Sequence, residues 1–214
     1  DYETDRMNPK KQGYEQILQP SDRIPFLWIL ALALIPALLL FVFAPPLAAR
    51  ALALFLLLSV GYSAPPIRAK ARPFLDTVFN SLYVMPALVG YGLFTSHLPP
   101  ISLIGAGIVW CMAMHAYSAI PDQEVDRAAQ IETIATVLGT KRTLWWCVVC
   151  FVMAAALTIP WLGFFAGLLL LPYLFLLGSS FSAQKPTDVH RWYQWFPFVN
   201  GAIGFLLVMF VLFS

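Results

Sequence analysis

Charged residues are scarce in this sequence. Asp, Glu, Lys and Arg make up 11% of its 214 residues, hydrophobic residues make up 60%, and the mean hydropathy is +0.75. Water-soluble domains typically have about 45–50% apolar and about 25% charged residues. This composition excludes a water-soluble domain and predicts an integral membrane protein.

Cysteine is also rare, and all three cysteines lie in apolar segments: Cys111, Cys147 and Cys150. Cys147 and Cys150 form a C-x-x-C pair, a pattern that occurs in redox and zinc sites. A zinc site needs about four converging ligands, and no His or acid accompanies the pair in its segment. We therefore interpret these cysteines as small buried hydrophobic residues.

The N-terminal region lacks the features of a cleavable signal peptide. Residues 1–23 are polar and contain neither an apolar core nor a small-residue cleavage site. The sequence starts at Asp1, without an initiator Met. We expect a fragment whose missing upstream part contains further membrane helices.

Long apolar segments are abundant. A helix crossing a hydrocarbon core of about 30 Å needs roughly 17–25 residues. Seven segments are long enough or nearly so, and we predict an all-α, polytopic membrane bundle with helices at 24–44, 46–62, 74–94, 101–120, 142–159, 161–178 and 195–213. The second segment is short, and the two segments around Pro160 could form one broken hairpin.

The charges are unevenly distributed between the two membrane faces that these segments imply. If the segments alternate through the bilayer, one face carries every Lys and Arg except Arg50, so the positive-inside tendency makes that face cytoplasmic. All eleven acids gather there too, although Asp and Glu contribute little to orientation. Either the loops on this face are simply longer and more polar, or a polar site with chemistry lies there.

One acid pair stands out at this face. Asp122 and Asp126 are four residues apart, so on a helix they face the same way, and Arg127 follows directly. Carboxylate oxygens suit Mg²⁺, which typically takes one or two protein carboxylates and completes its shell with phosphates and water. A solvated helix start would also favour acids because of the helix dipole, so the pair alone does not decide between the two interpretations.

A second acid pair with the same spacing opens the chain. Asp1 and Asp5 are again four residues apart, on the same expected face, ahead of an apolar helix. Two such pairs could hold two metal ions.

A basic loop lies between the two acid pairs in sequence. Arg68, Lys70 and Arg72 place three cations in five residues, after a turn that is stiffened by two prolines. Metal ions bridging phosphate oxygens, with Lys and Arg supplying the remaining positive charge, are the usual arrangement for polyphosphate leaving groups. The loop could instead be solvated and only set the orientation in the membrane.

Several polar residues fall inside apolar segments, where they are functional candidates by default. Asp76 and Asn80 are four residues apart at the start of the third segment. His115, Tyr117 and Asn200 are as compatible with hydrogen bonds between helices as with a site. Aromatic residues at segment ends favour the interface, and we interpret these as membrane anchors: Trp145, Trp146, Trp192, Tyr193 and Trp195.

Together these motifs resemble the UbiA-type intramembrane prenyltransferases, which bind an allylic diphosphate through magnesium held by two facing acidic motifs. The family's loop Tyr-Ser-x-x-Pro-x-x-x-Lys is matched by Tyr62, Ser63, Pro66 and Lys70. Its second motif, Asp-x-x-x-Asp-Arg-x-x-Gly-Ile-x-Thr, is matched by Asp122, Asp126, Arg127, Ile131 and Thr133. Gln130 replaces the motif's Gly, which puts the local turn in doubt more than the metal site.

The resemblance covers nearly the whole chain and explains its start. The family's first motif ends in two acids with the spacing of Asp1 and Asp5, so its Asn and first Asp would lie upstream. The family has nine helices, and a cut inside the first motif would leave seven. We thus expect the N-terminal two to be missing, with residues 1–23 as a cytoplasmic loop and residues 24–214 as a single transmembrane domain.

Within the family, two strings are similar to lycopene elongases, which make fifty-carbon carotenoids. They are Asn-Pro-Lys-Lys after the first acid pair and His-Ala-Tyr-Ser-Ala-Ile-Pro-Asp before the second. The implied reaction is five-carbon elongation of a carotenoid at the plasma membrane, with the active-site loops on the cytoplasmic face. The implied partners are a prenyl diphosphate such as dimethylallyl diphosphate, a lipophilic acceptor such as lycopene, and membrane lipids, with no nucleic acid.

The resemblance also assigns roles. The implied cofactor is Mg²⁺, with the four acids Asp1, Asp5, Asp122 and Asp126 as ligands. Lys70 and Arg127 join the second acid pair as catalytic residues, because they stabilise charge as the allylic C–O bond breaks. Substrate-binding roles fall to Tyr62, Arg68, Lys70, Asn80 and Arg127.

Other functions stay open at this point. The same family would accommodate a chlorophyllide, an aromatic acid or a glycerol phosphate lipid as acceptor. An ion-coupled secondary transporter would use Asp76 or the acid pairs near the midplane, but the acids lie at segment ends. A non-catalytic scaffold would not depend on magnesium. A CDP-alcohol phosphotransferase would need an Asp-Gly step that is absent, and squalene-type synthases lack this many spanning segments.

Overall fold

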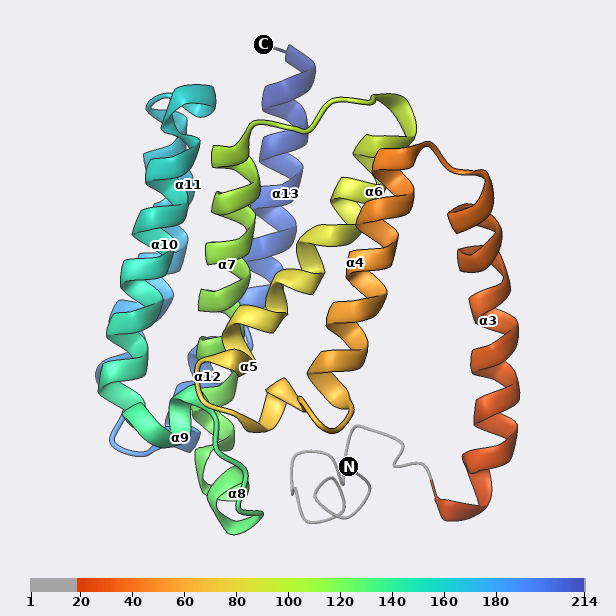
Figure 1. The fold of residues 1–214 in the computed structure, drawn as a ribbon. Helices are drawn as coiled ribbons and strands as arrows, with labels where there is room; N and C mark the ends of the chain where they lie inside the picture. Colours follow the sequence, from red (N-terminus) through yellow and green to blue (C-terminus); the bar gives the residue numbers. More distant parts are fainter. Residues whose placement is uncertain (1–18, 214) are drawn as a thin grey trace.

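The computed structural model describes residues 19–213, and the structural statements below concern these residues. Helix is their only regular secondary structure, and the long helices stand side by side as a bundle (Figure 1). The prediction of an all-α membrane bundle is therefore confirmed.

Six helical segments are long and apolar enough to cross a membrane. They are α3 (Arg23–Phe43) with the short η1 (Pro20–Asp22), α4 (Pro46–Ser63), the composite segment Leu75–Phe94, α7 (Ile101–Ala119) with its extension to Ala128, α10 (Thr140–Leu162), and α13 (Phe196–Phe213) with the short helices before it. The seventh predicted segment is α11 (Phe165–Ser180), whose 16 residues span about 24 Å at 1.5 Å per residue. The structure thus places a helix in each predicted segment, with α11 shorter than the other six.

The segment Leu75–Phe94 is not one continuous α-helix. It comprises α5 (Leu75–Val78), the 3₁₀ helix η3 (Phe79–Val84) and α6 (Met85–Phe94). A 3₁₀ stretch inside a helix often marks a functional site or local strain. Both intramembrane polar residues that the sequence singles out here, Asp76 and Asn80, lie in this irregular part.

Pro160 does not divide a hairpin in the way the sequence suggested. α10 continues through Pro160 to Leu162, and the reversal into α11 occurs at Gly163. Gly163 has φ +53°, in the left-handed region that glycine adopts without steric cost.

The tightest packing lies among α7, α10 and α11. Small residues on α7 and α10, such as Ala113, Ala116 and Cys147, are fully buried and let these helices approach closely. Aromatic rings fill the space toward α11 and α13, with Phe151 stacked on Tyr173 at a centroid distance of 4.6 Å. All three cysteines are buried free thiols, in agreement with their interpretation as small hydrophobic residues.

The helices at the other edge are less enclosed. No residue of α3 is buried, and α3 stands apart on the outer side of α4 (Figure 1). α4 and α6 cross closely at Gly92, where an added Cβ would lie 2.6 Å from the backbone nitrogen of Ala48. The outward side chains of α3 are large and apolar, as expected for a surface in contact with lipid.

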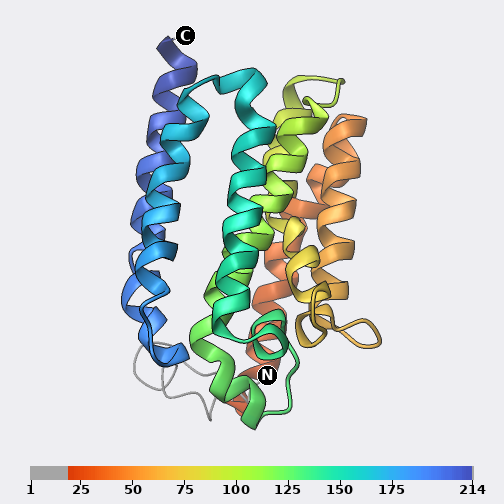
Figure 2. The same cartoon turned by 90° about the vertical axis from the view of Figure 1, so that its left-hand side faces the viewer.

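The two ends of the bundle differ in their connections. At one end the links are short: residues 44–45, 95–100 and 163–164. At the other end lie longer stretches that carry η2 (Ala69–Ala71), η4 (Ile120–Asp122), α8 (Gln123–Ala128), α9 (Ile134–Leu138), η5 (Pro186–Val189) and α12 (His190–Tyr193). Figures 1 and 2 agree that α8, α9 and the loop after α4 lie at one end, so the motifs that the sequence assigns to one face do share it.

Candidate active site

The basic loop after α4 folds as a short, internally bonded turn. Arg72 donates from Nη2 to the carbonyl oxygen of Pro66 at 2.8 Å, which closes the loop on itself. Lys70 lies in η2 and is half-buried, whereas Arg68 is exposed and has φ +42°. Of the two cations predicted to bind substrate, Lys70 is thus the one that faces inward.

The second acid pair sits where α7 gives way to α8. Asp122 ends η4 and caps α8, and Asp126 lies one turn later in α8, so the two share a helical face as predicted. Both are half-buried, while Glu124 and Arg127 on the same short helix are exposed. Arg127 donates from Nη2 to the carbonyl oxygen of Thr136 at 3.1 Å and so ties α8 to α9.

Gln130 occupies the position where the family motif has Gly, and its backbone has φ +55°. The turn is intact, because the backbone N–H of Gln130 donates to Arg127 at 3.1 Å and that of Ile131 to Asp126 at 2.8 Å. A left-handed residue is a common way to end a helix, and glycine adopts it most readily. The substitution therefore keeps the turn in a conformation that costs free energy for a residue with a Cβ.

The end of the second motif starts α9. Thr133 caps this helix by accepting from the Thr136 backbone N–H at 3.3 Å, and the Thr136 hydroxyl oxygen accepts from the Thr133 N–H at 2.8 Å. This reciprocal capping box explains a Thr at the motif's last position by helix initiation alone.

Three of the predicted motifs meet around Tyr62, at the end of α4. The Tyr62 side chain is hydrogen-bonded to Asn80 of η3, and the carboxylates of Asp76 and Asp126 are both close enough to act electrostatically on its hydroxyl. The structure therefore brings together Tyr62, Asn80 and Asp126 from three separate elements. Asp1 and Asp5 lie outside the described residues.

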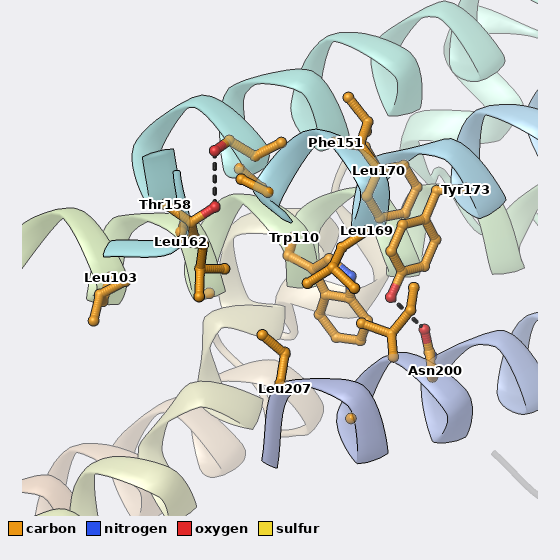
Figure 3. A pocket seen from close by; sticks show the side chains of 17 residues that line it. Leu103, Trp110, Phe151, Thr158, Leu162, Leu169, Leu170, Tyr173, Asn200 and Leu207 are labelled. Atoms are coloured by element: carbon orange, nitrogen blue, oxygen red, sulfur yellow. Dashed lines mark hydrogen bonds between the residues drawn. The ribbon is translucent and has the colours of Figure 1, made fainter. Parts of the chain in front are cut away.

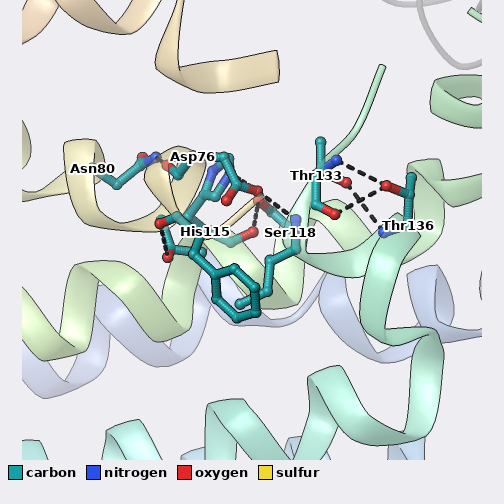
Figure 4. A network of polar contacts seen from close by, with 9 residues as sticks. Asp76, Asn80, His115, Ser118, Thr133 and Thr136 are labelled. Carbon is teal, nitrogen blue, oxygen red and sulfur yellow. Dashed lines mark hydrogen bonds and ion pairs between the residues drawn. The ribbon is translucent and has the colours of Figure 1, made fainter. Parts of the chain in front are cut away.

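Asp76 is fully buried and joins α5 to α7 and α9 (Figure 4). Its Oδ2 accepts from the backbone N–H of Ile134, the first residue of α9, at 2.8 Å. The same oxygen lies 3.4 Å from His115 Nε2. Within the described part of the chain, Asp76 Oδ1 and His115 Nε2 have no hydrogen-bond partner.

Three side chains that the sequence did not assign to the site lie beside it. Tyr193 is hydrogen-bonded to Ser118 and lies in the electrostatic range of Asp122 and Tyr83. The interpretation of Tyr193 as a membrane anchor is wrong, because its ring packs inside the bundle against Tyr117 at 5.3 Å. The position of Ser118, four residues before Asp122, was the one signal in the sequence.

The remaining polar candidates form bonds between helices. The hydroxyl groups of Tyr117 and Ser180 lie 2.8 Å apart and connect α7 to α11. Tyr173 donates to Asn200 Oδ1 at 2.8 Å and connects α11 to α13. His115 instead pairs with an acid, so the three polar positions have different roles.

An apolar cavity of about 390 Å³ opens among α7, α10, α11 and α13. In Figure 3 the rings of Trp110, Phe151 and Tyr173 lie around it, and the Tyr173–Asn200 hydrogen bond forms a polar corner. Phe196 stacks near Trp110 at 6.1 Å and near Tyr193 at 5.9 Å. A continuous series of aromatic rings thus leads from this cavity toward Asp122.

The donor set at the acid pair is compatible with Mg²⁺. Among residues 19–213 no cluster of three or more metal-ligating side chains occurs, so Asp122 and Asp126 would be the carboxylates available from this part of the chain. Two carboxylates suffice for a Mg²⁺ ion whose remaining ligands are phosphate oxygens and water. A closed structural metal site, with all its ligands from protein, is not what the described residues offer.

Comparison with known proteins agrees with this geometry. The model of the UbiA prenyltransferase family matches residues 1–212. A lycopene elongase/hydratase from Haloarcula japonica is 37% identical over 99% of this chain and 71% of its own length, and one from Corynebacterium glutamicum is 33% identical over 97% and 77%.

A solved structure has the same fold. It is that of a UbiA homolog from Archaeoglobus fulgidus bound to DMAPP and Mg²⁺, with a TM-score of 0.72. The match covers 95% of this chain and 79% of that one, at 19% identity. The match to the family model, supported by these relatives, shows that the chain is a membrane prenyltransferase and belongs to the UbiA prenyltransferase family.

Proposed function

We propose that this protein transfers an isoprenyl group from an allylic diphosphate, such as dimethylallyl diphosphate, to the end of a lycopene-like polyene, in a reaction that depends on Mg²⁺. The membrane domain over residues 24–214 would act in the plasma membrane, with the polar end of the bundle toward the cytoplasm. The names of the curated relatives, lycopene elongase/hydratase, support the acceptor. The donor and Mg²⁺ are supported by the ligands of the Archaeoglobus fulgidus structure.

The observation that carries this proposal is the convergence around Tyr62. One side chain touches Asn80 of the composite third span and lies within electrostatic range of Asp126 of the second acidic motif, and it belongs to the helix that leads into the basic loop. Solvated acids and a solvated basic loop would not require such a meeting of three elements. A charged ligand held between acids and bases at a membrane boundary would.

The diphosphate would be held from two sides. Half-buried Lys70 and exposed Arg68 provide positive charge from the basic loop, and Arg127 provides it from α8. Asp122 and Asp126, together with Asp1 and Asp5, would bind Mg²⁺, whose charge offsets that of the leaving diphosphate. Tyr62 and Asn80 would orient the substrate, since they are hydrogen-bonded to each other at the edge of the apolar interior.

The acceptor would lie in the apolar interior. The cavity beside Trp110, Phe151 and Tyr173 is open, lined by flat rings and small residues, and suited to a hydrocarbon chain. The ring series through Phe196 and Tyr193 leads from there toward Asp122. A polyene could therefore enter from the lipid while the charged donor arrives from the aqueous face, and water would be kept from the reactive cation.

The decisive experiment expresses the full-length protein in a lycopene-producing host and measures carotenoid masses. We expect new carotenoids heavier than lycopene by whole isoprenyl units. Their absence with an Asp122→Ala, Asp126→Ala double variant of equal abundance would tie them to the acidic motif. An unchanged pigment profile with the active protein would refute the lycopene acceptor and leave the other lipophilic acceptors to be tested in the same way.

A further inference from the structure

We propose that His115 takes the proton that is released after prenyl transfer, and that buried Asp76 positions it for this task. The inference rests on the proposed function and adds a catalytic residue to it. No family motif described above contains His115 or Asp76; the assignment comes from their geometry.

The burial of Asp76 calls for an explanation. Its exposed fraction is 0%, within a segment that spans the membrane, and a buried carboxylate is costly unless it is paired and hydrogen-bonded. The Ile134 N–H at 2.8 Å satisfies only one oxygen. A simple cap for α9 would not need a carboxylate, since a neutral amide oxygen can also accept that bond.

His115 is placed to complete this arrangement. Its Nε2 lies 3.4 Å from Asp76 Oδ2, and neither Nε2 nor Asp76 Oδ1 has a hydrogen-bond partner within residues 19–213. A carboxylate beside one ring nitrogen fixes the tautomer and stabilises the ring once the other nitrogen accepts a proton, as in the His–Asp pair of serine proteases. With Nε2 turned to Asp76, Nδ1 is the nitrogen left to meet a substrate, and 16% of the His115 side chain stays exposed.

The position of His115 fits the reacting carbons rather than the diphosphate. It lies seven residues before Asp122 on α7, about 10 Å deeper along the helix at 1.5 Å per residue. Its ring meets Tyr62 edge-on at 6.3 Å, and Tyr62 in turn lies within electrostatic range of Asp126. The histidine therefore sits next to the proposed donor site, on its apolar side.

The chemistry requires a base at this depth. When a double bond of the acceptor attacks the allylic carbon, a new C–C bond forms and a positive charge is left on a tertiary carbon of the acceptor. Loss of a proton from the neighbouring carbon turns that C–H bond pair into a new C=C bond. The proton passes to His115 Nδ1, giving an imidazolium opposite Asp76, and then to an oxygen of the departing diphosphate.

The test measures how the cation is resolved, not only how much product forms. In purified protein with labelled dimethylallyl diphosphate and lycopene, we expect His115→Gln to lower formation of the deprotonated alkene product by about 10²-fold or more. Capture of the cation by water, which yields an alcohol and a free proton, should take a larger share of the remaining product. Asp76→Asn keeps an acceptor for the Ile134 N–H and should shift the same ratio less.

Several arms separate the possible explanations. His97→Gln makes the same chemical change in the loop at the other end of the bundle and should leave the ratio unchanged. His115→Ala with added imidazole should regain alkene, which a misfolded variant would not do. An unchanged alkene-to-alcohol ratio in both His115→Gln and Asp76→Asn would overturn the inference and assign the proton to the diphosphate. If the unaltered protein elongates no carotenoid, it is the proposed function that fails instead.

Discussion

Asp76 and the Asp122–Asp126 pair lie at the same end of the bundle but in different surroundings. Asp122 and Asp126 are half-buried, one turn apart, on a short helix beyond the end of the span. Asp76 is fully buried inside a span and holds the first backbone N–H of α9 together with His115.

The difference separates two uses of a carboxylate. A half-buried pair keeps oxygens available for a metal ion and pays a modest desolvation cost, so its loss should affect activity more than folding. A buried carboxylate with fixed partners organises the elements around it, so its loss should affect folding as well. The following predictions test this contrast.

The largest effect is expected at the acid pair. Asp122→Asn or Asp126→Asn should lower prenyl transfer at least about 10²–10³-fold, the scale for losing one group that stabilises charge in the transition state. The unfolding midpoint in detergent should stay close to that of the unaltered protein. Glu124→Gln, an exposed acid on the same helix, is the matched control and should retain activity.

Lys70 should come next. Lys70→Ala removes a half-buried cation and should weaken binding of an allylic diphosphate about 10–100-fold, in line with about 1.5–3 kcal/mol for a hydrogen bond to a charged group. Titration calorimetry in the presence of Mg²⁺ measures this change. Lys141→Ala removes an exposed cation at the same end of the bundle, and an equal loss there would mean that only overall charge matters.

Asp76 should show the opposite balance between folding and activity. Asp76→Ala leaves the buried N–H of Ile134 without its acceptor, which should destabilise the protein by about 1–3 kcal/mol. Asp76→Asn should recover most of that stability. Denaturation in mixed micelles measures both variants, and a fully stable Asp76→Ala protein would contradict the organising role of this carboxylate.

The smallest effect is expected at the turn after α8. Gln130→Gly should stabilise the protein by up to about 1 kcal/mol, because glycine adopts a positive φ without the cost that a Cβ imposes. Gln130→Ala keeps the Cβ and is the control, with little change expected in the unfolding midpoint. A midpoint that falls with glycine would show that the Gln130 side chain contributes contacts that outweigh the strain.

Much of the site could be predicted because its signals are local. Spacing alone placed Asp122 and Asp126 on one helical face, and the cations of the basic loop are contiguous in sequence. The helices followed from apolar length, since each had to cross the same hydrocarbon layer. Errors arose where length was ambiguous, as at Pro160, which α10 passes through.

The rest depended on contacts between distant elements. Nothing near Asp76 in the sequence indicates that its partners are Ile134, 58 residues away, and His115. Tyr193 was misread because an aromatic residue at a helix end looks the same whether it faces lipid or the neighbour of an acid. The positive φ of Gln130 was foreseen only as a doubt, since a family glycine marks a backbone conformation and not a side-chain role.

One measurement tests the central claim most directly. Purified full-length protein in lipid nanodiscs is given labelled dimethylallyl diphosphate and lycopene, and the label in the carotenoid fraction is followed with Mg²⁺, with a chelator, and after Mg²⁺ is restored. The account predicts transfer of label to lycopene that stops with the chelator and returns with the metal. Transfer that ignores the chelator, or bound donor that never labels a lipophilic acceptor, would contradict it.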